Sequence, residues 1–202
     1  MARVLILFAH PAYQRSRINR HLIRAAADVE GVTVNDLYEC YPDLMIDVER
    51  EQRLLAEHDV IVFHHPFYWY SSPAILKEWQ DLVLTHGWAY GTGAEGLAGK
   101  VALQCITTGG GAEVYQEGGF NRYTIRQFLA PFDQTCRLCK MTWLGAFAVH
   151  GTHEIQDEAA MLGHTADYRR LLEALRDGRV DFTAAQKVAR LNEDLDGIIR
   201  GD

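Results

Sequence analysis

Hydrophobic residues gather in short continuous runs along the chain, and amphipathic segments lie between these runs. Residues 4–9 and 60–63 are apolar runs too short for helices, which is typical of strands buried on both faces of a parallel sheet. Residues 32–37 alternate apolar and polar side chains and predict a strand at an edge of the sheet. Residues 100–106 and 143–149 complete the set of expected strands.

Apolar residues spaced three and four apart predict helices between these strands. The expected helices cover about residues 16–29, 47–58, 73–86, 121–129 and 156–176, and a last helix opens at Thr183 with a capping-box pattern. Pro131 is expected to break the fourth helix, and Gly178 to stop the fifth. Strands that alternate with helices, without an internal repeat, predict a parallel sheet covered on both faces.

Two of the helices carry more detailed expectations. Ser16 is a candidate N-cap with Asn19 at the third helical position, and Ser72 and Pro73 are expected to serve as N-cap and first-turn proline of the helix over 73–86. That helix should bury a broad stripe of side chains, which are Ile75, Leu76, Trp79, Leu82 and Val83.

Right-handed crossovers favour an α/β, flavodoxin-like arrangement with a five-stranded parallel sheet of order 2-1-3-4-5. Residues 1–177 are expected to form this domain, and residues 178–202 a C-terminal helical extension. The extension contains apolar residues at intervals of three and four, namely Val188, Leu191, Leu195 and Ile198. We expect this stripe to pack against its own subunit or across a dimer, with an outside partner as the alternative.

The composition is that of one globular domain, with 202 residues, 48% of them hydrophobic and 23% charged. A net charge of -7 and a pI near 5.7 argue against nucleic-acid binding, which needs a basic surface. No apolar run approaches the roughly 20 residues of a membrane span. The first strand shows no signal-peptide pattern, so a cytoplasmic protein with reduced cysteines is expected.

Cysteine and histidine patterns do not predict a metal site. Cys136 and Cys139 form a C-x-x-C pair, but no second ligand pair and no thioredoxin-type turn accompanies it, so neither zinc nor redox chemistry is expected. His150 and His153 follow the fifth strand without a carboxylate at ligand spacing. They are expected at the rim of a pocket.

Three loops that follow expected strands carry the candidate chemistry. Residues 10–19 lead into a helix, whose free N–H groups and dipole favour a phosphate, although this turn could simply cap its helix. Residues 67–70 offer aromatic rings to a planar ligand, although four aromatics can equally fill a core or a subunit contact. Residues 107–111 include glycines that let a backbone approach a ligand closely. In the predicted strand order these loops meet in one crevice.

Taken in order, these motifs resemble the NAD(P)H:quinone reductase family of flavodoxin-like fold. The matching pieces are His10-Pro11, Ser16-x-x-Asn19, HPFYWYSSPAILKEW at 65–79, HGWAYG at 86–91 and TTGG at 107–110. LYECYPDLMIDVEREQ at 37–52 and HGWAYG are further similar to the ancillary proteins of glutathione-regulated potassium-efflux antiporters. The resemblance covers about residues 3–176 and leaves the tail without a counterpart.

The resemblance implies a flavin site. The flavin phosphate would lie against His10, Ser16, Arg17, Ile18 and Asn19, the ring against Phe67, Tyr68, Trp69 and Tyr70, and the opposite ring edge against Thr107, Thr108, Gly109 and Gly110. The backbone N–H groups of Trp69 and Tyr70 would face ring atoms N5 and O4. Tyr115 would stabilise the negative charge that a reduced flavin carries near N1 and O2.

The resemblance also implies a substrate pocket shared between two subunits. Asn121 stands where related enzymes pair their tyrosine with a histidine, and it would line the pocket together with His150. Trp88 and Tyr90 lie in a loop that would cross to the partner subunit and cover its flavin. A homodimer with two shared sites is therefore expected.

The implied reaction is ping-pong hydride transfer from NAD(P)H through the flavin to a quinone. The flavin would be FMN, with FAD as the alternative, because the family contains both. A regulatory ancillary subunit of a membrane antiporter, held peripherally at the inner membrane face and with secondary reductase activity, is the alternative function. A flavodoxin-like electron carrier fits less well, because a carrier does not need the loop that contains Trp88 and Tyr90.

Overall fold

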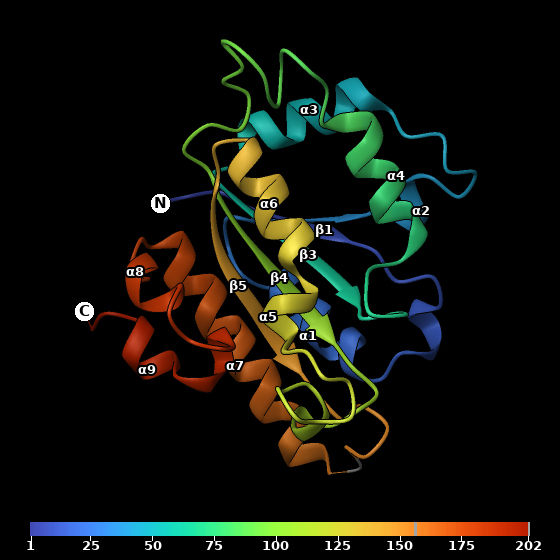
Figure 1. Cartoon of the computed structure of the whole chain (residues 1–202), viewed down its shortest axis with the longest axis vertical. Helices are drawn as coiled ribbons and strands as arrows, with labels where there is room; N and C mark the ends of the chain where they lie inside the picture. The colour runs from blue at the N-terminus through green and yellow to red at the C-terminus, as the bar shows by residue number, and fades with distance from the viewer. Residues whose placement is uncertain (156, 202) are drawn as a thin grey trace.

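The computed structural model describes residues 1–155 and 157–201. One parallel sheet forms its centre, and its strands are β1 (Val4–Phe8), β2 (Val32–Asp36), β3 (Val60–Pro66), β4 (Val101–Thr107) and β5 (Thr142–Val149). The strand order is β2-β1-β3-β4-β5, which confirms the predicted flavodoxin-like α/β fold (Figure 1).

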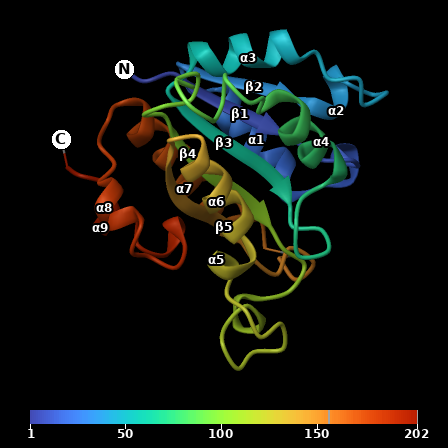
Figure 2. The same ribbon diagram turned by 45° about the horizontal axis from the view of Figure 1, so that its top comes forward.

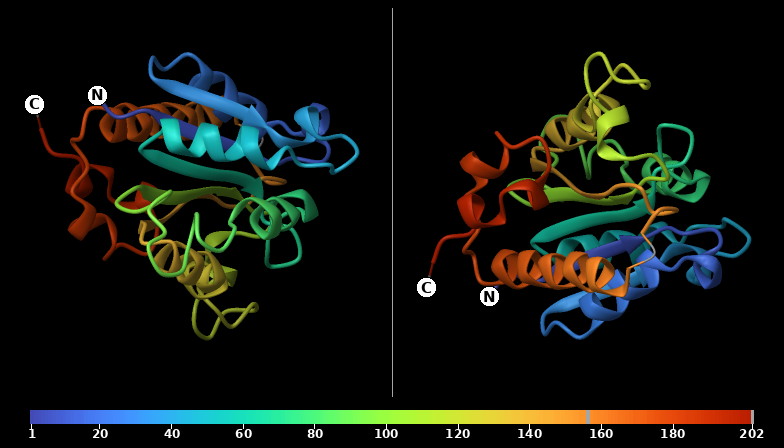
Figure 3. Two further views of the ribbon diagram at one scale, coloured as in Figure 1. Left: turned by 90° about the horizontal axis from the view of Figure 1, so that it is seen from above. Right: turned by 90° about the horizontal axis from the view of Figure 1, so that it is seen from below.

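Helices cover both faces of this sheet (Figure 3). The α-helices are α1 (Ile18–Ala27), α2 (Leu37–Cys40), α3 (Val48–Glu57), α4 (Ala74–Val83), α5 (Ile125–Phe128), α6 (Ala130–Leu138), α7 (Glu158–Arg176), α8 (Phe182–Ala185) and α9 (Leu195–Ile198). Short 3-10 helices are η1 (Tyr13–Arg15), η2 (Ala112–Val114) and η3 (Leu191–Glu193). The expected start of α7 at Gln156 lies outside the described residues.

Two hydrophobic cores lie on the two faces of the sheet. One core joins α1, α7 and the C-terminal tail, and the other joins α3, α4 and α6. Successive residues of β3 face opposite cores because side chains alternate along a strand. Thus His64 lies against Tyr168 of α7, whereas His65 stacks on Phe132 of α6.

The start of α4 differs from the prediction. The helix begins at Ala74, and Pro73 is its N-cap, with φ -55 and ψ 148, so Ser72 does not cap it. A residue before proline is held in extended backbone, which moves the helix start past Ser72. Four of the five expected stripe residues are buried, but Leu82 is 39% exposed because it lies at the solvent side of the stripe.

Pro131 begins a helix and does not break one. The expected helix over 121–129 shrinks to α5, with a capping box between Thr124 and Gln127, and Pro131 lies in the first turn of α6, a helix that the sequence pattern did not predict. Proline is tolerated there because the first N–H groups of a helix have no partner within the helix.

The tail is not the single helix expected from Thr183. Asp181 caps α8, and η3 and α9 follow as separate short helices. Gly178 does end α7, with φ +70. The apolar residues Leu191, Leu195 and Ile198 are nevertheless buried in the core beside α7, so the stripe packs against its own subunit (Figure 2).

Side chains of the tail bond the free edge of β5. Asn192 pairs with both main-chain groups of Ala148, since Asn192 Oδ1 accepts from Ala148 N at 2.9 Å and Asn192 Nδ2 donates to Ala148 O at 3.0 Å. Gln186 Nε2 donates to the carbonyl of Trp143 at 3.1 Å. These bonds satisfy main-chain groups that a further strand would otherwise satisfy.

None of the helices in the described part of the chain combines the length and hydrophobicity that a membrane-spanning segment needs. All four cysteines, Cys40, Cys105, Cys136 and Cys139, are free thiols.

Candidate functional site

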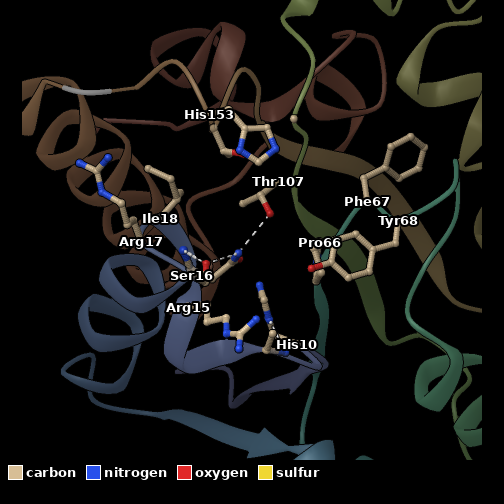
Figure 4. A pocket seen from close by; sticks show the side chains of 14 residues that line it. His10, Arg15, Ser16, Arg17, Ile18, Pro66, Phe67, Tyr68, Thr107 and His153 are labelled. Atoms are coloured by element: carbon tan, nitrogen blue, oxygen red, sulfur yellow. Dashed lines mark hydrogen bonds between the residues drawn. The ribbon is translucent and has the colours of Figure 1, made fainter.

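A cavity of about 350 Å³ opens at the carboxyl ends of β1, β3 and β4 (Figure 4). The fold brings the three predicted loops together here, because parallel strands end at the same edge. The predicted site residues that line the cavity are His10, Ser16, Arg17, Ile18, Asn19, Phe67, Tyr68, Thr107 and Gly109. Ser16 and Ile18 lie on one side of it, and Phe67 and Tyr68 on the other (Figure 4).

The amino end of α1 forms one side of the cavity. Ser16 Oγ accepts a hydrogen bond from Asn19 N at 3.2 Å and so satisfies one N–H group of the first turn, although the N-cap position itself is Arg17 and not Ser16. The remaining N–H groups of the first turn and the helix dipole favour an anion at this position. Arg15 and Arg17 line the same end and add positive charge.

His10 offers a neutral N–H group to the cavity. Its Nδ1 accepts from Ala12 N at 3.1 Å, and burial lowers the pKa of His10. A neutral imidazole that accepts at Nδ1 carries its proton on Nε2. His10 can therefore donate one hydrogen bond, and its ring packs edge-on against Tyr68 with ring centres 6.3 Å apart.

Asn19 connects the helix end to β4. Its side chain is 2% exposed, and Nδ2 donates to Ser16 Oγ at 3.0 Å and to Thr107 Oγ1 at 3.1 Å. Its Oδ1 lies 2.9 Å from His64 Nε2. The two ring nitrogens of His64 lie against side chains of α1 and α7, which are Asn19 and Tyr168.

The aromatic loop makes a tight left-handed turn. Trp69 and Tyr70 have φ values of 50 and 62, and Tyr68 O accepts from Ser71 N at 3.0 Å. Left-handed backbone costs a non-glycine residue roughly 1–2 kcal/mol, and such strain concentrates at functional sites. Phe67 anchors the turn, being 7% exposed, whereas Trp69 is 92% exposed.

Tight contacts position the loop after β4. A Cβ atom on Gly109 would lie 3.0 Å from the His153 ring, so a larger residue would displace that ring or the loop. Thr108 Oγ1 donates to Gly110 O at 2.8 Å and lies 2.9 Å from His150 Nδ1. Gly110 O also accepts from Gly151 N at 2.9 Å. The segment after β5 therefore supports the backbone of this loop.

Tyr115 lies beside this loop, on a second cavity of about 300 Å³. Burial raises the pKa of Tyr115, although a hydrogen bond with Thr108 acts the other way, so the phenol stays protonated. Its ring centre is 5.9 Å from that of Phe67 and 5.4 Å from that of His150. The second cavity is also lined by Arg190, which comes from the tail.

His150 and Asn121, the other residues predicted for a substrate pocket, also lie near this loop. His150 lines the second cavity, and burial, followed by the charge of Arg190, lowers the pKa of His150 to about 4. Asn121 Oδ1 accepts from the Tyr70 hydroxyl at 3.2 Å. Asn121 therefore contacts the aromatic turn and does not contact Tyr115 through a hydrogen bond in the described structure.

Trp88 and Tyr90 lie far from this crevice within the subunit. Their loop precedes β4, and Lys140, which precedes β5, donates to Ala94 O at 2.8 Å and to Glu95 at 2.7 Å. The loop thus lies at the amino ends of these strands, beyond α4 at the top of Figure 1. Both residues are half-buried. Their approach to a partner's flavin stays a prediction.

The cavity also includes residues that the sequence did not single out, namely Ala12, Arg15, Pro66 and Thr152. Arg15 lies in the same turn as Ser16, so its positive charge beside an expected phosphate site could have identified it from the sequence. Thr152 enters from the loop after β5, where Thr152 N donates to Thr108 O at 3.0 Å. His153, expected at a pocket rim, lies on it.

Histidine, cysteine, aspartate and glutamate side chains in the described ranges do not form a cluster of three that could hold a metal ion. Cys136 and Cys139 lie on and just after α6, and burial raises the pKa of both thiols.

Three solved structures are similar to this chain in sequence and in fold. A solved structure named as a thermophilic tryptophan halogenase from Streptomycin violaceusniger is 41% identical, with a TM-score of 0.79, and the match covers 82% of this chain and 96% of that one. The general stress protein 14 of Treponema denticola, solved in complex with FMN, is 33% identical, with a TM-score of 0.78 and coverage of 87% and 98%. The NADPH-quinone reductase of P. pentosaceus is 31% identical, with a TM-score of 0.77 and coverage of 84% and 97%.

Curated sequences point to one group. The glutathione-regulated potassium-efflux system ancillary protein KefG of Serratia proteamaculans (strain 568) is 52% identical over 148 residues, which are 73% of this chain and 81% of that protein. KefG of Enterobacter sp. (strain 638) is 46% identical over 167 residues, 83% of this chain and 91% of that protein. A family model described as a flavodoxin-like fold matches residues 2–172. The chain therefore belongs to the flavodoxin-like family, in the group that includes the KefG ancillary proteins.

Proposed function

We propose that the protein is a flavin-dependent NAD(P)H:quinone oxidoreductase that binds FMN. The observation that carries the proposal is the cavity at the carboxyl ends of β1, β3 and β4, where an anion site adjoins an aromatic turn and a glycine loop. The likeness to a solved FMN complex and to a solved NADPH-quinone reductase supports the same cofactor and reaction class.

The residues of the cavity suit a phosphorylated flavin. The first turn of α1, the hydroxyls of Ser16 and Thr107, and the charges of Arg15 and Arg17 would hold the phosphate. A neutral His10 adds a donor without adding a charge that must be desolvated. This combination of donors favours FMN over the dephosphorylated riboflavin.

The ring would lie between the aromatic turn and the glycine loop. A bound flavin supplies a carrier that accepts hydride from NAD(P)H and passes two electrons to a quinone. Gly109 leaves room for a ligand beside the backbone, and the strained turn at Trp69 and Tyr70 would aim N–H groups at it. Tyr115, kept protonated by burial, would donate to negative charge at the ring edge and so favour the reduced cofactor.

A homodimer would complete the site. Trp88 and Tyr90 are too far from the crevice of their own subunit to cover it, so a partner's loop would supply these rings. The proposal predicts a dimer in solution, and a monomer with full reductase activity would contradict it.

Cofactor identification and kinetics test the proposed function. The purified protein should be yellow and release FMN, identified by mass, and initial rates with NAD(P)H and a benzoquinone should give the parallel lines of a ping-pong mechanism. Gly109→Val should lose flavin absorbance because its side chain meets the His153 ring. Gly163→Val, at a position with open space around the Cβ, is the control that should keep it. A colourless wild-type protein that gains no absorbance with added FMN would refute the proposal.

A second candidate function is that of an ancillary subunit for a glutathione-gated potassium-efflux antiporter at the membrane. The names of relatives that are 52% and 46% identical favour it. Potassium efflux from cells that express the antiporter with and without this chain would test it, and the Gly109→Val variant would separate flavin-dependent activation from docking. High quinone turnover without a partner, together with no effect on potassium efflux, would refute the ancillary-subunit function and support the enzymatic one.

A further inference from the structure

A chain of hydrogen bonds runs from the core to the phosphate end of the cavity. The Tyr168 hydroxyl lies 3.3 Å from His64 Nδ1, and His64 Nε2 lies 2.9 Å from Asn19 Oδ1. Asn19 Nδ2 then donates to Ser16 Oγ and to Thr107 Oγ1. Asn19, Ser16 and Thr107 line the cavity, whereas Tyr168 and His64 lie behind them and are 0% exposed.

The direction of each bond in this chain fixes the direction of the next. When His64 carries its proton on Nε2, the oxygen of Asn19 must accept it, and the amide nitrogen of Asn19 faces the two hydroxyls. When the proton is on Nδ1, the Asn19 amide must turn over, and Ser16 and Thr107 give their protons to its oxygen. Only the first direction leaves both hydroxyl protons available to an anion in the cavity.

The orientation of Asn19 in the structure is that of the first direction, since its Nδ2 faces the two hydroxyls and its Oδ1 faces His64 Nε2. Burial lowers the pKa of His64 to about 3, with smaller contributions from His65 and His10, so the ring is neutral and has one N–H group. Burial also raises the pKa of Tyr168 well above its usual value, so its hydroxyl keeps a proton that it can donate to Nδ1. The Cys105 thiol also forms a hydrogen bond with the Tyr168 hydroxyl.

We propose that His64 and Tyr168 are positioning residues, which hold the Asn19 amide in the orientation that makes the Ser16 and Thr107 hydroxyls donors to the phosphate of the cofactor. The inference rests on the proposed FMN site. It assigns a role in phosphate recognition to two side chains that do not touch the cavity, and it predicts that their loss affects FMN and not riboflavin.

Binding of FMN and of riboflavin to the apoprotein tests this role. His64→Leu removes the Nε2 donor and should weaken FMN binding about tenfold, the range expected when hydrogen bonds to a charged group are lost. Riboflavin, which has no phosphate, should bind as it does to the wild type. His64→Gln, whose amide can donate to Asn19, should restore most of the FMN affinity, and Tyr168→Phe should cause a smaller loss for FMN than His64→Leu.

His65→Leu is the matched control. His65 is the next residue of β3, equally buried, but it stacks on Phe132 on the other face of the sheet, and its Nε2 makes no hydrogen bond in the described structure. Its replacement should leave the ratio of FMN to riboflavin affinity unchanged. An equal loss of both ligands in His64→Leu, or the same change of ratio in His65→Leu, would overturn the inference.

Nitrogen-15 NMR of the wild type gives a test that does not depend on how variants fold. The His64 ring, assigned by its absence in His64→Gln, should show a protonated Nε2 and an unprotonated Nδ1 in the apoprotein and with FMN. A proton on Nδ1 in the FMN complex would refute the inference while leaving the proposed function intact. A wild type that binds neither FMN nor riboflavin would refute the proposed function first.

Discussion

Two buried polar networks lie on opposite faces of the sheet, and each is built around one side chain. On the face covered by α3 and α4, the wholly buried carboxylate of Glu51 accepts from Trp79 Nε1 at 2.8 Å, from the Tyr41 hydroxyl at 2.7 Å and from Asn35 Nδ2 at 2.8 Å. Arg50 contacts the same carboxylate from the surface side. On the face covered by α1 and α7, Asn19 joins His64 to two hydroxyls.

The networks differ in where they end. The partners of Glu51 bond this carboxylate from the core and, through Arg50, from the surface, and neither of the two cavities described above includes any of them. The Asn19 network ends in hydroxyls on a cavity wall, with capacity left for a ligand. Burial alone therefore does not distinguish a structural polar network from a binding one, since burial is common to both. Unused hydrogen-bonding capacity at a cavity makes the difference.

The largest effect is expected from Glu51→Leu. It leaves the Arg50 charge and three buried donors without their acceptor, so the free energy of unfolding should fall by about 3–5 kcal/mol. Urea denaturation of the apoprotein measures this loss. The ratio of FMN to riboflavin affinity in the folded variant should stay at the wild-type value, and a selective loss of FMN would break the contrast between the networks.

Asn19→Ala should act mainly on the ligand. Two hydroxyls lose their orientation and the helix end loses a buried contact, so FMN affinity should fall about a hundredfold, from hydrogen bonds of roughly 1.5–3 kcal/mol each to a charged group. Isothermal titration with FMN and riboflavin checks this. A loss of stability as large as that of Glu51→Leu, with both ligands weakened alike, would instead make Asn19 a structural residue.

Acid should lower the free energy of unfolding, because the folded protein buries two neutral histidines, His64 and His65. The pKa values of His64 and His65 are lowered by burial to about 3 and about 4, below the ordinary 6.5, so the unfolded chain binds protons that the folded one does not. Their contribution to stability is present above pH 6.5 and is lost as the pH falls from 6.5 to about 4 for His65 and to about 3 for His64. From pH 7 to 5.5 the two should cost about 2 kcal/mol together.

His64→Gln should reduce the loss of stability between pH 7 and 5.5 by about 1 kcal/mol, as denaturation at several pH values would show. An unchanged slope would mean that other groups dominate the acid response.

The smallest effect should come from an exposed charge pair. Lys77 Nζ lies 2.5 Å from Oδ1 of Asp81, which is one turn further along α4, but both side chains are more than half exposed. Lys77→Ala should change the free energy of unfolding by about 0.5 kcal/mol or less, because water and salt screen such pairs. The effects of Glu51→Leu and Asn19→Ala can be compared with this small value. A loss above 1 kcal/mol in Lys77→Ala would contradict the expectation that exposed charge pairs contribute little.

Local features of the site could be predicted from the sequence. The spacing of Ser16 and Asn19 predicts that the Ser16 side chain bonds the first helical turn, and the apolar runs predict the strands whose order brings three loops together. The Asn19 network could not be predicted, because His64 lies 45 residues and Tyr168 a further 104 residues along the chain. Only tertiary packing brings such distant side chains together.

The errors have similar physical reasons. Pro131 lies where proline stops a helix in most sequence patterns, yet the first turn of a helix tolerates it, and the pattern alone does not separate the two cases. The tail carries a helical spacing of apolar residues from Val188 to Ile198, but its side chains bond the edge of β5, and this tertiary contact divides it into short segments.

The bonds that Asn192 and Gln186 make to β5 have a consequence for behaviour at high concentration. An uncovered edge strand can accept a strand from another molecule and so nucleate aggregates. Here the chain blocks its own edge with two side-chain amides, without adding a sixth strand. The tail thereby covers this edge near both of its ends, at Trp143 and at Ala148, and should keep the sheet from growing between molecules.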